Sequence, residues 1–407
     1  MSSRSTNSAR LLWLATAIAG TAIAQSFPPL PVAHEGATVS VLATGLHDPR
    51  GIALGRAGSL YVAEGGTTEG VFTLPPGPPL TDLSRDRCVM YWPVAPVVGG
   101  HTGRVSRIDA SGKVSVIADE LPSVALNTLI GGDRLSAASV ALIGNRLYAL
   151  IAGAGCSHGH ASEPNGIYRI YPDGVAQPVV DLSNLLRGLN DVKDASDPTF
   201  EPDGSWYSMV HAFGALYAVE PNRGTFVRVT EAGEVTVLAD LIDAVNQTEG
   251  DGDQTWTALT RRGNHFYIGT LGRINTGFAG AVYRLSRDGS QITRVVSGLH
   301  GVVGISFDTV GRMYVLETTA AGVDPPLSDP SAGRLVRVER DGSVTPILTA
   351  LAFPTALVTG RDGTFYVTNC GYGCNDRTNF PAALPSLRAG QVLKVKLAEA
   401  NAARRDN

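Results

Sequence analysis

The sequence has few charged residues and lacks the short motifs that identify the common enzyme classes. Charged residues make up 17% of the 407 residues, whereas there are 47 Gly and 24 Pro. This composition favours many short strands joined by tight turns over a helical bundle. The chain contains no Gly-x-Ser-x-Gly, His-Glu-x-x-His, phosphate-loop or dinucleotide-binding pattern. These absences disfavour a serine hydrolase, a zinc protease, a kinase and a nicotinamide-dependent enzyme.

Long hydrophobic runs are missing beyond the N-terminal segment. Arg4 and Arg10 precede an apolar stretch at residues 11–20, and residues 22–24, Ala-Ile-Ala, fit the small-x-small rule for cleavage. We therefore predict a signal peptide at residues 1–24 and a secreted or periplasmic protein without a transmembrane anchor in the mature chain. A buried N-terminal helix is the alternative interpretation.

A cluster of Lys and Arg is also missing. The formal net charge is −4, and it becomes −6 when residues 1–24 are removed, because that segment holds two Arg and no acidic residue. A mildly acidic surface argues against nucleic acid as a partner. A small molecule or an extracytoplasmic protein is then the expected partner.

Cysteine is scarce, with four residues in the chain. Export would place them in an oxidising compartment, where pairing is the default. Cys370 and Cys374 are close enough in sequence to close a small loop, which would leave Cys88 and Cys156 as the second pair, although four cysteines allow three connectivities. A zinc site is the alternative, disfavoured because no second closely spaced Cys/His pair completes the usual ligand spacing.

What the chain does contain is a repeated unit, and each copy predicts four short strands of alternating polarity. The second strand of each copy carries a Tyr after an apolar residue: Tyr61, Tyr148, Tyr217, Tyr267, Tyr314 and Tyr366. The third strand carries a basic residue: Arg107, Arg169, Arg228, Arg284, Arg337 and Lys394. A turn ending in Gly follows the third strand in five copies: Gly112, Gly174, Gly233, Gly289 and Gly342.

The sixth copy lacks its fourth strand, because the chain ends soon after Leu397. Residues 38–46 read like the fourth strand of the first copy and would supply the missing one. We therefore predict an all-β fold, a six-bladed β-propeller of four-stranded blades, closed by residues 38–46 pairing with residues 391–397. Closure of this kind removes the unpaired edges of an open array.

The predicted organisation follows from this closure: a signal peptide at residues 1–24, a linker at 25–37, the propeller at 38–397 and a disordered tail at 398–407. The long connections follow the second and fourth strands of the units. Successive strands alternate in direction, so these connections all leave the same face, and we expect the functional site there.

The units resemble the ScyD/ScyE family of exported propellers. The resemblance is carried by Gly45 to Leu54, Leu60 to Gly66, Gly103 to Asp109 and Tyr267 to Leu271. It covers roughly residues 38–397. Membership implies a secreted or periplasmic six-bladed propeller without an assigned reaction, and NHL-type and SMP-30-type propellers share the same blade logic. The sequence departs from the family in its third blade, where residues 203–207 read Asp-Gly-Ser-Trp-Tyr.

Polar side chains end the second strand of four units: Glu64, Glu220, Glu317 and Asn369. Carboxylate and amide oxygens are the ligands that Ca²⁺ prefers. If the four converge on the mouth of the channel, they predict a calcium site of the kind that SMP-30-like lactonases use, with the metal acting as a Lewis acid. The alternative is that they cap loops or bind channel water.

Four further side chains are candidate ligand contacts. Arg50 and Arg134 offer bidentate hydrogen bonds to a carboxylate, or else form ion pairs between blades. Trp256 offers a stacking surface if it is not part of the core. His300 lies near a strand end, where it would act as a general base or as a hydrogen-bonded structural histidine.

Two other clusters carry weaker predictions. The acidic run at residues 249–253 lacks the full EF-hand spacing and is interpreted as a solvated loop. His158 and His160, beside Cys156, resemble a clip for a soft metal, although two histidines at this spacing are common by chance in loops.

Together these observations predict an exported propeller that binds a small molecule or a protein partner on its loop-rich face. The alternative is a Ca²⁺-assisted hydrolase or lactonase of SMP-30-like type, working at the channel mouth through Glu64, Glu317 and Asn369. A quinone-dependent sugar dehydrogenase is disfavoured because no set of residues suggests a clamp for the cofactor.

Overall fold

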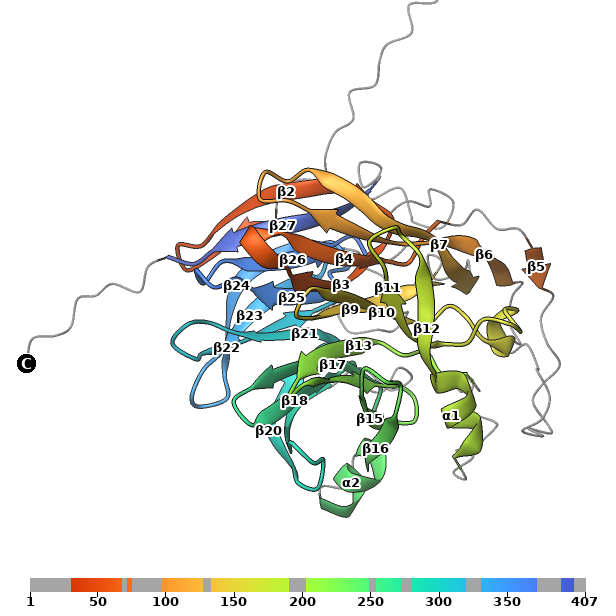
Figure 1. Ribbon diagram of the computed structural model, residues 1–407. Helices are drawn as coiled ribbons and strands as arrows, with labels where there is room; N and C mark the ends of the chain where they lie inside the picture. The colour runs from red at the N-terminus through yellow and green to blue at the C-terminus, as the bar shows by residue number, and fades with distance from the viewer. Residues whose placement is uncertain are drawn as a thin grey trace, which may run out of the picture.

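The chain folds into six antiparallel sheets arranged in a ring, which makes it a six-bladed β-propeller (Figure 1). The structure is a computed structural model, and it describes residues 31–67, 72–74, 97–126, 133–189, 203–248, 254–272, 280–319, 331–371 and 389–398. The predicted fold class is confirmed. The predicted signal peptide lies outside the described residues, as does the C-terminal tail apart from residue 398.

Each blade is a sheet of at least four strands. The first blade comprises β3 (Pro49–Leu54), β4 (Leu60–Glu64), β5 (Phe72–Leu74), β6 (Val97–Ile108), β7 (Val114–Leu126) and β8 (Asp133–Leu135). The second comprises β9 (Ala137–Ile143), β10 (Arg146–Ile151), β11 (Gly166–Ile170) and β12 (Ala176–Asp181). The third comprises β13 (Ser208–Ala212), β14 (Ala215–Val219), β15 (Thr225–Val229) and β16 (Val235–Asp240).

The remaining blades follow in chain order. The fourth comprises β17 (Trp256–Arg262), β18 (His265–Thr270), β19 (Gly280–Ser286) and β20 (Ile292–Leu299). The fifth comprises β21 (Val302–Phe307), β22 (Met313–Glu317), β23 (Gly333–Val338), β24 (Val344–Leu351) and β1 (Val32–Ala33). The sixth comprises β25 (Ala356–Thr359), β26 (Phe365–Asn369), β27 (Gly390–Lys396) and β2 (Thr38–Leu46).

The first strand of each blade faces the axis of the ring. Each of these strands contacts the first strands of the two neighbouring blades, in the cyclic order β3, β9, β13, β17, β21, β25 and back to β3. The ring is therefore closed around one axis.

Closure depends on the N-terminal strand. β2 pairs antiparallel with β27, from Thr38 opposite Lys396 to Leu46 opposite Gly390. The predicted partner segment at 391–397 is correct to within one residue. The strand that begins the propeller thus completes its last blade.

The repeated Tyr and the repeated basic residue are direct neighbours. In every blade they lie opposite each other on the second and third strands: Tyr61 and Arg107, Tyr148 and Arg169, Tyr217 and Arg228, Tyr267 and Arg284, Tyr314 and Arg337, Tyr366 and Lys394. Cross-strand pairs of this kind are the units that stabilise a sheet. The sequence repeat is therefore the repetition of one pair.

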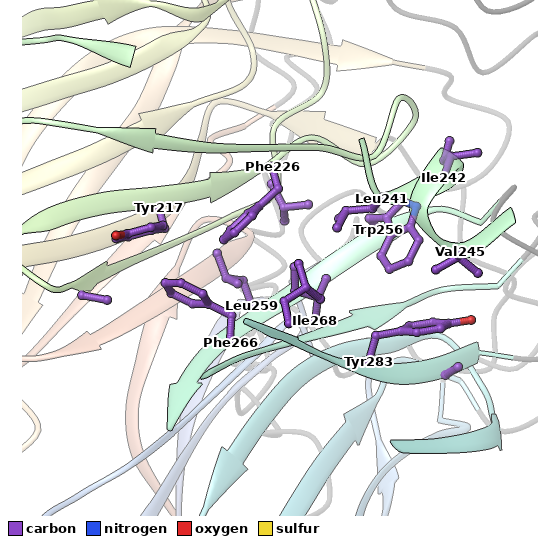
Figure 2. Close-up of a cluster of buried hydrophobic side chains, with 14 of the residues drawn as sticks. Tyr217, Phe226, Leu241, Ile242, Val245, Trp256, Leu259, Phe266, Ile268 and Tyr283 are labelled. Atoms are coloured by element: carbon purple, nitrogen blue, oxygen red, sulfur yellow. The ribbon is translucent and has the colours of Figure 1, made fainter. Parts of the chain in front are cut away.

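The hydrophobic core is divided among the blade interfaces. Six clusters of buried apolar side chains occur, and each joins two consecutive blades, including the sixth and the first. The cluster between the third and fourth blades holds Tyr217, Phe226, Phe266 and Trp256, all at most 1% exposed (Figure 2). Burying each such side chain contributes roughly 1.5–3 kcal/mol, so packing between blades contributes a large part of the stability.

The turn glycines pack against the preceding blade. Gly112, with φ +90°, and Gly233, with φ +87°, both adopt a left-handed conformation. A Cβ atom at Gly112 would lie 2.1 Å from the carbonyl oxygen of Leu42, and one at Gly233 would lie 2.4 Å from that of Val179. Leu42 and Val179 belong to the outermost strand of the previous blade, so the glycine lets the turn reach that strand.

Three segments differ from the prediction. Residues 32–33 of the predicted linker form β1, which extends the edge of the fifth blade. The two connections predicted as loops after the fourth strands of the second and third blades begin as helices, α1 (Leu182–Gly188) and α2 (Leu241–Thr248). β6 and β7 are longer than expected and form an arm that projects from the first blade (Figure 1).

Both helices begin with an aspartate cap. The side chain of Asp181 accepts a hydrogen bond from the backbone N–H of Asn184 at 2.8 Å, and Asp240 accepts one from Asp243 at 3.0 Å. Such caps satisfy backbone donors that a helix leaves unpaired. The pattern is visible in the sequence, but helices this short show too few turns for a periodic signal.

We expect Gly233→Ala to destabilise the propeller more than Gly342→Ala. Both positions have positive φ, but a Cβ at Gly342 meets nothing within 4 Å. The strained conformation alone should cost about 1–2 kcal/mol in each variant. Overlap with the Val179 carbonyl should add about 1–3 kcal/mol in Gly233→Ala. Urea unfolding compares the two, and equal losses would contradict the packing of the turn on the previous blade.

Candidate functional site

The four predicted calcium ligands all lie where the second strand of a blade ends. Glu64, Glu317 and Asn369 are the last residues of β4, β22 and β26, and Glu220 directly follows β14. All four are at most 3% exposed. The hydrogen-bond partners of these four side chains indicate whether they bind a metal ion or support the fold.

Glu64 and Glu317 make the same pair of contacts in two different blades. Oε2 of Glu64 accepts the backbone N–H of His47 at 2.5 Å and the Nε–H of Arg104 at 2.8 Å. Oε1 of Glu317 accepts the backbone N–H of His300 at 2.5 Å, and its Oε2 contacts Arg334. In each blade the carboxylate ties the end of the second strand to the segment that enters the blade.

Asn369 and Glu220 make related contacts. Oδ1 of Asn369 accepts the backbone N–H of Ala352 at 2.8 Å, and Glu220 accepts those of Arg223 at 2.6 Å and Ser205 at 3.3 Å. We call these hydrogen bonds to Glu64, Glu220, Glu317 and Asn369 the corner contacts.

The corner contacts accompany a sharp change in chain direction. The residue after the amide donor has a left-handed conformation in three blades: Asp48 with φ 49°, Gly301 with φ 58° and Phe353 with φ 39°. A backbone N–H buried at such a bend needs a partner. The acidic and amide side chains supply it.

The structure does not bring the three predicted carboxylate ligands together. In the part of the chain that is described, one group of three His, Cys, Asp or Glu side chains is close enough to share an ion, and it contains none of Glu64, Glu220 and Glu317. Their observed contacts fit the loop-capping alternative, and the calcium site stays a prediction.

A cavity lies on the axis, at the end where the first strands begin. It is small: about 30 Å³ is open to the centre of a water molecule, within about 380 Å³ of unfilled space that includes its open mouth. Residues at or just before the start of β3, β9, β13 and β25 line it, among them Arg50, Arg134, Ser205, Tyr207 and Thr355. Ser205 and Tyr207 belong to the segment where the sequence departs from the ScyD/ScyE pattern, so that departure lies in the cavity wall.

The two predicted ligand-binding arginines meet in this cavity wall. Nη2 of Arg50 donates to the backbone oxygen of Arg134 at 2.6 Å, and Nη1 of Arg134 contacts Oδ2 of Asp48. Arg50 is 5% exposed and Arg134 is 2% exposed. Arg134 thus forms an ion pair with the segment that enters its own blade, and both guanidinium groups are held in place beside the cavity.

Trp256 is not placed to stack on a ligand. Its side chain is completely buried and packs against Tyr283, with the ring centroids 5.2 Å apart, and against Leu241 and Ile242 of α2 (Figure 2). The burial of this aromatic surface in the blade interface is the physical reason. His300 lies in the corner before β21, where its Nδ1 is 3.8 Å from Glu317, and it is not among the residues that line the cavity.

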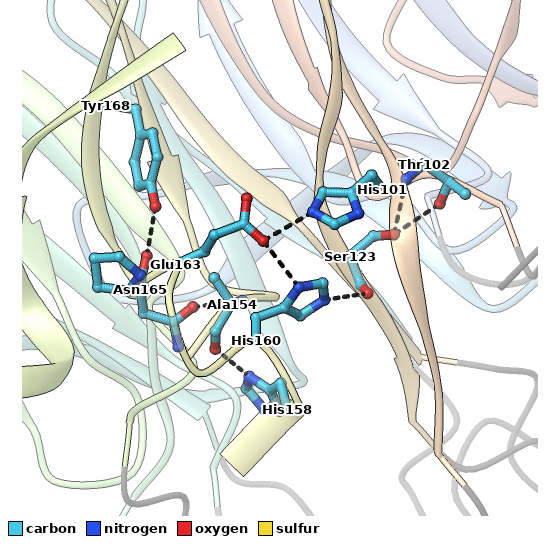
Figure 3. A network of polar contacts seen from close by, with 10 residues as sticks. His101, Thr102, Ser123, Ala154, His158, His160, Glu163, Asn165 and Tyr168 are labelled. Atoms are coloured by element: carbon cyan, nitrogen blue, oxygen red, sulfur yellow. Dashed lines mark hydrogen bonds and ion pairs between the residues drawn. The ribbon is translucent and has the colours of Figure 1, made fainter. Parts of the chain in front are cut away.

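The two histidines of the predicted metal clip separate. Nδ1 of His158 bonds to the backbone oxygen of Ala154 at 2.8 Å, whereas His160 turns toward His101 and Glu163 (Figure 3). The sequence pattern predicted that His158 and His160 would hold a metal ion together. It could not show that His101, on β6 of the previous blade, takes the place of His158.

Two cysteines lie within the described part of the chain, Cys156 and Cys370, and neither is a free thiol. Cys88 and Cys374 lie outside the described residues, as does the acidic run at 249–253. The predicted pairing of the cysteines therefore stays a prediction.

The fold has known counterparts among solved structures. The chain is similar to the calcium-binding protein regucalcin from Agrobacterium tumefaciens, with 14% identity over 88% of this chain and 92% of that one, and a TM-score of 0.51. It is also similar to a luciferin-regenerating enzyme, with 11% identity, coverage of 89% and 95%, and a TM-score of 0.51. A Bacteroides thetaiotaomicron protein of unknown function matches at 12% identity, coverage of 88% and 76%, and a TM-score of 0.51.

These likenesses show the fold. Identities this low carry no statement about family or activity. No family model matches the chain, and no curated protein matches it either. The ScyD/ScyE resemblance therefore stays a prediction. Among the described residues, no helix is both long enough and apolar enough to span a membrane.

We expect Glu64→Ala to lower the free energy of unfolding by about 2–4 kcal/mol, because it removes the buried carboxylate that accepts from the half-buried His47 amide and from Arg104. Glu231→Ala is the matched control, since Glu231 pairs with Arg146 at the surface and exposed pairs contribute about 0–1 kcal/mol. Urea unfolding without added metal measures both. Equal effects would contradict the structural role of the corner contact.

Glu220→Gln tests the charge of a corner carboxylate. Burial raises the pKa of Glu220 above its ordinary 4.5, so the folded chain holds the proton more tightly than the unfolded chain. Wild-type stability then falls as the pH rises from about 4.5 through the raised pKa. We expect the variant, which cannot ionise, to gain stability relative to wild type as the pH rises from about 4.5 through the raised pKa.

Glu231→Gln is the control of opposite sign for the pH series. Hydrogen bonds from Arg146 and Tyr148 lower the pKa of Glu231. The ionised form of Glu231 stabilises the fold above its ordinary pKa. The free energy of unfolding of this variant should therefore fall relative to wild type as the pH rises. Urea unfolding across the pH range gives both trends. A Glu220→Gln trend parallel to that of Glu231→Gln would contradict the burial argument.

Proposed function

We propose that this protein is an exported binding protein that takes a small carboxylate-bearing molecule into the cavity on its axis. The observation that carries the proposal is the meeting of Arg50 and Arg134 in the wall of that cavity, on the first strand and the last added strand of one blade. Export is proposed from the signal-like residues 1–24.

The charge and geometry of the cavity wall support an anionic ligand. A guanidinium group binds a carboxylate through two parallel hydrogen bonds, and burial strengthens such contacts. Both guanidinium groups line the cavity, and we assign the incoming carboxylate to Arg50, which is held against the backbone oxygen of Arg134. Tyr207 and Thr355, from two further blades, also line the cavity, and the Tyr207 hydroxyl lies 3.5 Å from the backbone oxygen of Thr355.

The size of the cavity limits the ligand. About 30 Å³ of the cavity is open to the centre of a water molecule, which is room for about two waters. We therefore assign only the carboxylate group of the ligand to the cavity and place the rest of the molecule at its mouth. A protein partner on the loop-rich face remains compatible with this cavity, but no contact among the described residues favours it.

The test is ligand binding by full-length protein with a panel of small organic acids and their amides. We expect acids to raise the midpoint of thermal unfolding and the neutral amides not to, because ligand binding stabilises the folded state. Calorimetry then measures affinity. Arg50→Lys keeps the charge but loses the planar fork, and we expect it to weaken acid binding by about 10-fold or more.

Arg340→Lys is the matched control, because Arg340 is exposed in the turn between β23 and β24, away from the cavity. It should bind as wild type does. Equal binding of acid and amide, or an unchanged affinity in Arg50→Lys, would overturn the proposal. Arg134 is a poor choice for this test, because its loss would leave buried Asp48 without its partner.

The Ca²⁺-assisted hydrolase of SMP-30-like type is the alternative in the same assay. One structural neighbour is a calcium-binding protein by name, and for this chain that is a reason to add about 1 mM Ca²⁺ and simple lactones. Lactone hydrolysis that needs Ca²⁺ and disappears in Glu317→Gln would favour the alternative over a binding protein.

A further inference from the structure

A polar cluster joins the projecting arm of the first blade to a loop of the second. His101 lies on β6 of the arm, and His160 and Glu163 lie in the loop between β10 and β11. Nε2 of His101 is 2.8 Å from Oε2 of Glu163, and Nδ1 of His160 is 3.2 Å from the same oxygen (Figure 3). All three potential ligand atoms lie within 4.8 Å of one another.

The orientation of His160 leaves Nδ1 as a ligand atom. Its Nε2 lies 3.1 Å from the backbone oxygen of Ser123 on β7. A carbonyl oxygen only accepts, so Nε2 carries the hydrogen, and in the neutral ring Nδ1 presents a lone pair to Glu163. Nδ1 and the Glu163 carboxylate lie 3.2 Å apart, and either a proton on Nδ1 or a metal ion between the two atoms makes this contact favourable. Metal-binding histidines characteristically donate their second N–H to a carbonyl in this way.

The loop holds its two ligands in place before any ion binds. Three backbone hydrogen bonds fix this loop: Gly155 N–H donates to the backbone oxygen of Glu163 at 2.7 Å, His160 N–H to that of Gly155 at 2.9 Å, and Glu163 N–H to that of His160 at 3.1 Å. Ser123 is fixed in turn by Thr102, whose backbone N–H donates to the Ser123 hydroxyl at 2.9 Å. Side chains held by a supporting shell make a site that binding does not have to organise.

We propose that His101, His160 and Glu163 form a binding site for a divalent transition-metal ion, and that the ion is zinc. Two imidazoles and one carboxylate suit zinc and disfavour calcium and magnesium, which take oxygen ligands. Ligands about 2.1 Å from a tetrahedral zinc lie about 3.4 Å apart, so the observed separations need only small adjustments.

The site would have three protein ligands and one open position. His160 is 4% exposed, whereas the side chains of His101 and Glu163 are 42% and 36% exposed, so the open position faces solvent. A bound ion would also fasten the arm to the second blade, because His101 comes from one and His160 and Glu163 from the other. Metal binding should therefore make the arm harder to cleave with protease.

The test is metal binding by full-length protein purified without a histidine tag. We expect wild type, after dialysis against Zn²⁺ and removal of the excess, to retain about one zinc per chain, measured by elemental analysis. Co²⁺ in place of Zn²⁺ should give visible absorption bands of four-coordinate cobalt. His101→Ala, whose side chain is largely exposed, should fold normally by circular dichroism and weaken zinc binding at least about 100-fold.

His265→Ala is the control, because His265 is exposed on β18 of the fourth blade. It should retain zinc as wild type does, and Zn²⁺ should raise the unfolding temperature of both proteins but not of His101→Ala. Glu163→Gln should also lose the cobalt spectrum. Wild type that retains no zinc, or His101→Ala that binds zinc as tightly as His265→Ala, would overturn the proposal and leave an ordinary hydrogen-bonded cluster.

Discussion

The pairing of β2 with β27 is the interaction on which the ring depends. Without it the last blade would expose the edge of β27, and an unpaired edge invites association with other chains. The same strand delivers Ala43 and Leu46 to the cluster between the sixth and first blades. Every blade packs against its two neighbours, so loss of the pairing between β2 and β27 would expose both the edge of the sixth blade and its contact with the first blade. The axial cavity lies beside the junction of these two blades.

The corner contacts explain why buried carboxylates recur at a place that suggests a metal centre. A blade turns into the next through a left-handed residue, and the amide beside that residue is buried, so an acceptor must come from the end of the second strand. Glu64, Glu317 and Asn369 meet this requirement at equivalent positions. Desolvation raises the pKa of Glu64, which is the cost of burying a charge at the corner. Folding geometry therefore gives these side chains a structural role, while the calcium site stays a prediction, and the cavity wall adds the two arginines.

The sequence predicts the parts of this structure that repeat. The Tyr and the basic residue of each unit pair across two strands, and Gly112 and Gly233 occupy positions where only glycine fits. Both features recur at regular spacing, so the sequence predicts them. It could not predict partners that come from different blades. The alternation of polar and apolar residues shows that Glu64 ends a strand, but it does not show that the carboxylate accepts the His47 amide. The sequence around Trp256 is equally compatible with a stacking surface for a ligand and with packing in the core. The extended arm was missed because glycines at 99 and 100 and at 103 interrupt β6 and look like loop.

The arm gives the two candidate sites a common element. Ser123, which orients His160, lies on β7, and the next residues of β7 pair with β8, where Ala125 lies opposite Arg134. β8 in turn places Arg134 in the wall of the axial cavity. A constraint on the arm at His101 and His160 therefore acts on the strand that holds a cavity arginine, through backbone pairing and not through a chain of flexible side chains.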